Sequence, residues 1–202
     1  MAHSKGTAEQ ILNLAHRAGV VSAREVRKLG IHPEYLRRLC AAGRLVRVGR
    51  ALYMLPDADV TAQHDLAVAV KAVPRGVVCL LSALSFHNIG MQVPHEVWLA
   101  IGRRSAAPRV KWPQMRIMRF SGKALMEGIE KHTIERVPVS IYNAAKTVAD
   151  CFKYRNKVGL DVALEALREV MRERRCTIEE LWRYAKVCRV TNVMRPYMEA
   201  LV

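Results

Sequence analysis

Residues 21–56 place the strongest constraint on the fold, because two short helical patterns are followed directly by an alternating basic segment. Ser22 is a residue type preferred at helix N-caps, and Glu25 three residues later completes a capping box. Gly30 is suited to ending a helix. The pattern therefore predicts a short helix between Ser22 and Gly30.

A second short helix is predicted to follow almost at once. Pro33 is pre-set for the first position of a helix, and Leu36, Leu39 and Cys40 fall on one face. If the leucines are buried, two guanidinium groups and one carboxylate point outward, an arrangement that suits the major groove of DNA. The residues of this helix that we expect to contact DNA are Glu34, Tyr35, Arg37 and Arg38.

The apolar period changes after Gly43 from about 3.6 to 2, which predicts a hairpin with a turn at Gly49. A basic hairpin after two short helices is typical of a winged helix-turn-helix. Its arginines have no acidic neighbours, so we expect them to contact phosphate. The residues expected to contact DNA from the first short helix and the hairpin are Ser22, Arg24, Arg27, Lys28, Arg44, Arg47 and Arg50.

The charge balance favours a polyanionic partner. Residues 24–50 hold eight arginines or lysines and two glutamates, a net charge of +6. The whole chain of 202 residues carries 33 basic and 18 acidic residues, for a net charge of +15. Double-stranded DNA is therefore the expected partner. A basic helix pair that binds nothing stays open as the alternative.

Two domains are expected, residues 1–58 and residues 59–202, joined near the helix-breaking stretch 56–59. A helix over residues 7–19 completes the first. The second reads as an α+β domain in which helices cover a small β-sheet. Its expected strands are residues 77–81, 97–101, 115–120 and 134–139, and its expected helices are residues 62–73, 82–87 with Ser82 as N-cap, 141–152, 161–174 and 178–188 behind the capping pair Thr177 and Glu180.

A second basic cluster lies in the C-terminal domain, where Glu96 is the only carboxylate between residues 66 and 126. It could contact the DNA backbone, or it could be a sheet edge whose charges prevent self-association. Both interpretations stay open. The residues of this cluster are Arg103, Arg104, Arg109, Lys111, Arg116 and Arg119.

The sequence does not favour catalysis, a cofactor or a metal site. It has no nucleotide-binding glycine motif, no zinc-protease motif and no pair of closely spaced cysteines. His87 is expected to be a hydrogen-bonded imidazole, and Asp150 is expected to bond a backbone amide or an arginine. No apolar run approaches the roughly 20 residues that span a bilayer, and no signal peptide is apparent, so we expect a cytoplasmic protein.

The order of three motifs resembles the AbiEi family, the antitoxin and repressor half of bacterial type IV toxin-antitoxin systems of abortive infection. The first motif is the hairpin, residues 43–53, and the second is Ser82-Ala83-Leu84 with His87 and Gly90. The third consists of residues 146–151 followed by residues 159–168.

The resemblance implies a winged-helix protein that binds inverted repeats in its own promoter and represses the operon. It also implies a second activity that opposes a nucleotidyltransferase toxin, with or without direct contact. An RNA- or tRNA-binding protein, or a plain transcriptional regulator without a toxin, are the alternatives. The family's wing commonly reads Arg-Gly-x-Tyr, whereas Ala51 follows Arg50 here; if that residue needs a positive φ, alanine costs about 1 kcal/mol, unless the turn rests on Gly49.

Overall fold

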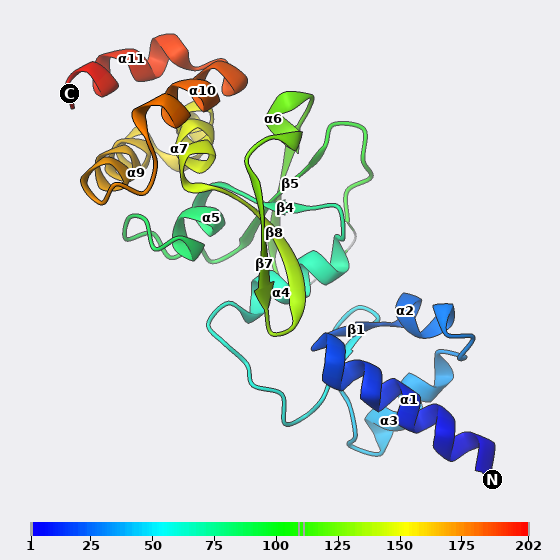
Figure 1. The fold of residues 1–202 in the computed structure, drawn as a ribbon. Helices are drawn as coiled ribbons and strands as arrows, with labels where there is room; N and C mark the ends of the chain where they lie inside the picture. The colour runs from blue at the N-terminus through cyan, green and yellow to red at the C-terminus, as the bar shows by residue number, and fades with distance from the viewer. Residues whose placement is uncertain (1, 109, 111, 202) are drawn as a thin grey trace. The chain divides into compact units, whose positions relative to one another are not determined.

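The computed structural model is an α+β protein and describes residues 2–108, 110 and 112–201 (Figure 1). It divides into two compact units. The first consists of the residues up to Arg75 with Pro108–Gln114 and His132–Val139, and the second consists of Gly76–Ala107, Met115–Lys131 and the residues from Ser140. The expected division at residue 58 thus falls inside the first unit.

The first unit contains N-terminal helices and a three-stranded antiparallel sheet in the order β1-β3-β2. Its core is formed by the apolar faces of the first three helices, with Ile11, Val26 and Leu36 completely buried. The elements are α1 (Ala2–Ala18), β1 (Val21–Ser22), α2 (Ala23–Lys28), α3 (Glu34–Ala41), β2 (Val46–Gly49), β3 (Leu52–Met54) and α4 (His64–Ala72).

A tight turn at Glu135 and Arg136 is fastened to the rest of the first unit. The carboxylate of Glu135 accepts hydrogen bonds from the amide of Thr61 at 2.6 Å and from Nδ1 of His64 at 2.7 Å. Gly19, at φ +64°, lies so close that a β-carbon there would be 1.9 Å from the carbonyl oxygen of Glu135. Only glycine therefore fits at residue 19.

The second unit is built on a five-stranded mixed sheet in the order β6-β5-β4-β8-β7. Strands β5 and β6 are parallel, as are β4 and β8, whereas β4 and β5 are antiparallel. The strands are β4 (Val77–Val78), β5 (Val97–Gly102), β6 (Met115–Phe120), β7 (Ile129–Ile134) and β8 (Val137–Tyr142), residues 132–139 of the last two being grouped with the first unit.

Helices of the second unit gather on one side of this sheet (Figure 1). Its core joins the sheet to apolar faces of α5, α7, α9 and α10, with Leu84, Val148, Leu167 and Leu181 almost completely buried. The helices are α5 (Leu80–Phe86), α6 (Lys123–Met126), α7 (Ala144–Lys153), α8 (Arg155–Val158), α9 (Leu160–Arg172), α10 (Ile178–Cys188) and α11 (Thr191–Glu199).

Both predicted capping boxes are present, Ser22 with Glu25 and Thr177 with Glu180. The two strands expected over residues 97–101 and 115–120 are also confirmed, as β5 and β6.

Two local predictions are wrong. Ser82 does not cap a helix, because α5 already begins at Leu80 and the Ser82 hydroxyl accepts a hydrogen bond from the amide of Trp98 at 2.9 Å. Residues 134–139 are not one strand, because Glu135 and Arg136 both have positive φ and turn the chain between β7 and β8.

The described residues include no helix that is both long and apolar enough to cross a membrane.

Candidate nucleic-acid interface

Helix α3 is positioned by its buried leucines. Leu36 is completely buried and Leu39 is 6% exposed, so they anchor one face in the core of the first unit. The helix begins after Pro33, and Nδ1 of His32 accepts a hydrogen bond from the amide of Glu34 at 3.2 Å, which satisfies an otherwise free donor at the helix start. The opposite face is consequently exposed.

The exposed face of α3 carries two arginines that contact side chains of the same helix. Arg37 donates hydrogen bonds to Oε1 of Glu34 at 2.7 and 2.9 Å, although its side chain is 82% exposed. The hydrogen bond from Arg37 lowers the pKa of Glu34. The guanidinium of Arg38 lies 5.6 Å from the centre of the Tyr35 ring. A ligand of Arg37 would have to replace Glu34, whereas Arg38 has no carboxylate partner among the described residues.

Helix α2 contributes the exposed cations Arg24, Arg27 and Lys28. Ser22, which we expected to contact DNA, is occupied within the capping box. Its hydroxyl accepts from the amide of Glu25 at 3.2 Å and donates to the Glu25 carboxylate at 2.8 Å. The same carboxylate also accepts from Nζ of Lys71 in α4 at 2.7 Å. Ser22 therefore has a structural role in holding α2.

The hairpin of β2 and β3 exposes Arg44, Arg47 and Arg50. Nε of Arg47 donates to the carbonyl of Gly49 at 3.1 Å, which folds this side chain over the turn. Ala51 has φ +59° and supplies the left-handed residue of the turn, whereas Gly49 is not in that region. The interpretation that the turn rests on Gly49 is therefore wrong.

An open groove of about 760 Å³ runs along this hairpin within the first unit. Residues 47–50 form one wall, and Pro108, Val110 and Trp112 form the other. Trp112 is 55% exposed, and no carboxylate is among the described residues that line the groove. Arg109 and Lys111, two members of the predicted second cluster, lie outside the described residues. The groove could not be predicted from the sequence, because the hairpin and the wall formed by Pro108, Val110 and Trp112 are far apart in the chain.

The remaining members of the second basic cluster belong to the second unit. They differ in whether they bond to other groups of the protein. Arg103 and Arg104 are exposed after β5. Arg116 forms an ion pair with Glu96 at 2.9 Å and lies 4.6 Å from the Trp98 ring centre. Arg119 donates to backbone carbonyls, including that of Gly102 at 3.2 Å, so Arg116 and Arg119 both have partners within the unit.

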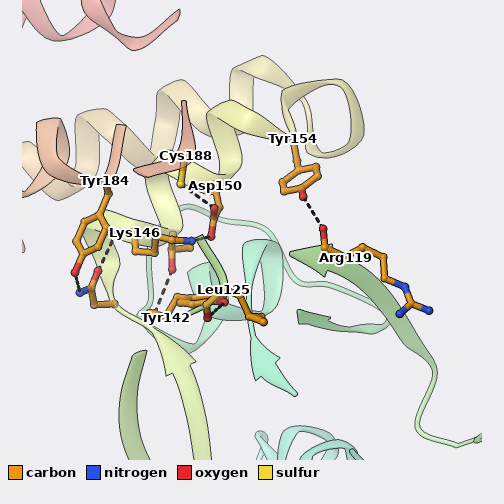
Figure 2. A network of polar contacts seen from close by, with 10 residues as sticks. Arg119, Leu125, Tyr142, Lys146, Asp150, Tyr154, Tyr184 and Cys188 are labelled. Atoms are coloured by element: carbon orange, nitrogen blue, oxygen red, sulfur yellow. Dashed lines mark hydrogen bonds and ion pairs between the residues drawn. The ribbon is translucent and has the colours of Figure 1, made fainter. Parts of the chain in front are cut away.

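A buried polar network in the second unit involves Asp150 (Figure 2). Its carboxylate accepts from Nζ of Lys146 at 2.5 Å and from Sγ of Cys188 at 3.1 Å. The prediction that Asp150 bonds a backbone amide or an arginine is therefore wrong. Burial raises the pKa of Asp150 although Lys146 opposes this. His87 is hydrogen-bonded as expected, from Nε2 to the Tyr142 carbonyl at 2.8 Å.

The described residues offer no group of three or more His, Cys, Asp or Glu arranged to hold a metal ion. All five cysteines are free. Burial raises the pKa of Cys79, Cys151 and Cys188, and it raises that of Cys176 to about 11, so these thiols stay protonated near neutral pH.

A comparison with protein families finds a match over the N-terminal part of the first unit. A family model described as "Transcriptional regulator, AbiEi antitoxin" matches residues 9–56, which include α2, α3 and the β2–β3 hairpin. A search of curated proteins found no match. The resemblance noted from the sequence is thus confirmed over this segment, in which the chain is similar to the AbiEi family of transcriptional regulators and antitoxins.

Proposed function

We propose that the protein is a sequence-specific regulator that binds double-stranded DNA through a winged helix-turn-helix. In this proposal α3 is the recognition helix and the β2–β3 hairpin is the wing. The observation that carries the proposal is that α3 buries Leu36 and Leu39 while it exposes Arg37 and Arg38. The family match over residues 9–56 and the element order α1-β1-α2-α3-β2-β3 support it.

The two basic elements would contribute in different ways. Arg37 or Arg38 would read base edges in the major groove, where an arginine contacts guanine with two hydrogen bonds. The Glu34 carboxylate must then release Arg37, so binding of Arg37 to DNA replaces one charged partner with another. The hairpin arginines and the adjoining groove would hold the phosphate backbone, which fixes the position of the protein without reading sequence.

We further propose that the DNA site consists of inverted repeats in the promoter of its own operon, and that the protein acts in the cytoplasm. The proposed second activity opposes a nucleotidyltransferase toxin. The family description supports both a regulatory and an antitoxin activity. An adjoining gene for a nucleotidyltransferase, and rescue of growth when both proteins are produced together, are the results expected for an antitoxin.

The test is a mobility-shift titration of the full chain with DNA from upstream of its own gene and with random DNA of equal length. Arg37→Ala and Arg38→Ala together should weaken binding to the upstream DNA by roughly 10- to 100-fold, because a bidentate arginine contact contributes about 1 to 3 kcal/mol. The control variant combines Arg168→Ala and Arg195→Ala, which remove two exposed cations from α9 and α11.

If the α3 variant binds the upstream DNA and the random DNA with the same affinities as the parent, α3 is not the element that recognises the DNA sequence. Preference for a structured RNA over both duplexes would favour the RNA-binding alternative.

A further inference from the structure

The second unit holds a pocket of about 380 Å³ that is surrounded by cations. Four basic side chains line it, together with Ser121 and the backbone of the turn that follows β6. Of the described residues that line it, none is a carboxylate. The four basic residues are Lys123, Lys153, Lys186 and Arg189.

These cations come from different elements of the unit. Lys123 begins α6, Lys153 ends α7, Lys186 lies in the last turn of α10, and Arg189 follows α10 in a left-handed conformation. Like charges brought together around a concave surface repel one another, so folding alone gives no reason to gather them.

The four cations also lack ion pairs among the described residues, unlike some other basic residues of the unit. Arg116 pairs with Glu96, Arg175 with Glu173 and Arg183 with Glu127. Among the described residues, no carboxylate lies within ion-pair distance of any of the four pocket cations. Their charge is therefore available to a ligand.

Side-chain hydrogen bonds hold in place the elements that carry the cations (Figure 2). The Tyr142 hydroxyl donates to the carbonyl of Leu125 in α6 at 2.7 Å, and the Tyr154 hydroxyl, directly after α7, donates to the carbonyl of Arg119 in β6 at 3.3 Å. Sγ of Cys188 joins α10 to Asp150 of α7 at 3.1 Å. The elements that carry the four exposed side chains therefore need little reorganisation when an anion binds, which favours affinity.

We propose that this pocket binds a small polyphosphate, either inorganic triphosphate or the phosphate chain of a nucleotide. A triphosphate carries three to four negative charges in a compact volume, which matches four cations around a pocket at the lower end of the range for small ligands. The Ser121 hydroxyl adds a neutral donor. The site lies in the second unit, and the proposal does not rest on DNA binding.

Calorimetric titration of the full chain at constant ionic strength tests the proposal, with inorganic triphosphate as the probe. The test variant combines Lys153→Gln and Lys186→Gln. The matched control combines Lys157→Gln and Arg195→Gln, which remove the same charge at exposed residues outside the pocket. We expect saturable binding that is about tenfold or more weaker in the test variant, because each charge-assisted hydrogen bond contributes substantially, and unchanged in the control.

Thermal unfolding provides a second measurement. Triphosphate should raise the melting temperature of the parent and the control but not of the test variant. Without ligand, the test variant should melt at the same temperature as the parent or higher, because repulsion is removed. Titration with ATP in place of triphosphate distinguishes an inorganic ligand from a nucleotide. Equal affinities mean that the phosphates alone are recognised, whereas tighter binding of ATP means that the nucleoside also contributes.

Three results would overturn the proposal. One is binding that does not saturate, and another is equal weakening in the test and control variants, because both indicate attraction to the overall positive charge. The third is weaker binding of duplex DNA by the test variant with unchanged affinity for triphosphate, because the lysines would then serve a polymer.

Discussion

Lys146 and Asp150 form an ion pair 2.5 Å long inside the second unit, and neither side chain is exposed to solvent. The ammonium group of Lys146 also lies 4.1 Å from the centre of the Tyr142 ring. Charges at such a depth are tolerated because each satisfies the other, while the desolvation cost cancels much of their attraction. The pair is therefore more sensitive to loss of one partner than to loss of both.

Asp150→Asn should destabilise the protein by about 3 kcal/mol or more, because it leaves the Lys146 ammonium buried without a counter-charge. Urea unfolding followed by circular dichroism measures the change. Lys146→Met combined with Asp150→Leu should recover much of the loss, since it removes both charges. Lys157→Met on the exposed surface serves as the control. A double variant that is less stable than Asp150→Asn would contradict this account.

Ala51→Gly should stabilise the protein by up to about 1 kcal/mol, because Ala51 has φ +59° in the turn between β2 and β3. Ala42→Gly is a matched control, since Ala42 has φ −82° and glycine there adds only chain entropy to the unfolded state. We expect the control to be less stable than the parent. Opposite signs for the two variants in urea unfolding are the expected result, and destabilisation by both would show that Ala51 is not strained.

Local signals in the sequence predicted local structure well. The capping boxes at Ser22 and Thr177 involve residues three apart, so both partners are visible in one turn of the chain. The strand β6 and its parallel neighbour β5 were likewise recognised from short apolar runs. The turn at Glu135 and Arg136 was missed because it contains no glycine, proline or asparagine, although both residues have positive φ.

Long-range partners could not be predicted from one sequence. Ser82 accepts a hydrogen bond from Trp98, and Arg116 pairs with Glu96. In both cases the fold of the sheet brings together residues that are distant in the sequence. Lys146 was missed for another reason: a lysine on a helix is ordinarily exposed, and only the packing around Asp150 buries it.

Acid should weaken the first unit through Glu135, whose carboxylate side chain is only 7% exposed. Burial raises its pKa, but the hydrogen bonds from Thr61 and His64 outweigh this and keep the pKa below the ordinary 4.5. A lowered pKa in the folded state stabilises the fold above about pH 4.5, and the stabilisation is lost as the pH falls through the folded-state pKa.

Glu135→Gln should therefore be less stable than the parent at pH 7. Between pH 5 and pH 3, a range of about one unit on either side of 4, the free energy of unfolding of the variant should fall less than that of the parent. Urea unfolding across this range measures both effects. Glu199→Gln, at the exposed end of α11, is the control and should follow the parent. If the free energies of unfolding of Glu135→Gln and the parent fall in parallel with pH, Glu135 does not cause the acid sensitivity.

Arg47→Ala should weaken binding to every duplex by a similar factor, because we expect the hairpin arginines to contact phosphate. Each lost phosphate contact lowers the slope of log K against log salt by roughly 0.9. Mobility-shift titrations at several salt concentrations, with upstream and random DNA, measure the slope. A loss confined to the upstream DNA would mean that Arg47 reads bases instead.

Arg103→Ala combined with Arg104→Ala tests whether the second unit also contacts DNA. Both side chains are exposed, whereas Arg116 is paired with Glu96 and Arg119 is bonded to backbone carbonyls. If Arg103 and Arg104 bind phosphate, the salt slope should fall by roughly 2. Arg116→Ala is the matched control and should leave the slope nearly unchanged, because its charge is already compensated. Identical slopes for the parent and the double variant would assign these two charges to another role, such as keeping the exposed edge strand β6 from pairing with a second molecule.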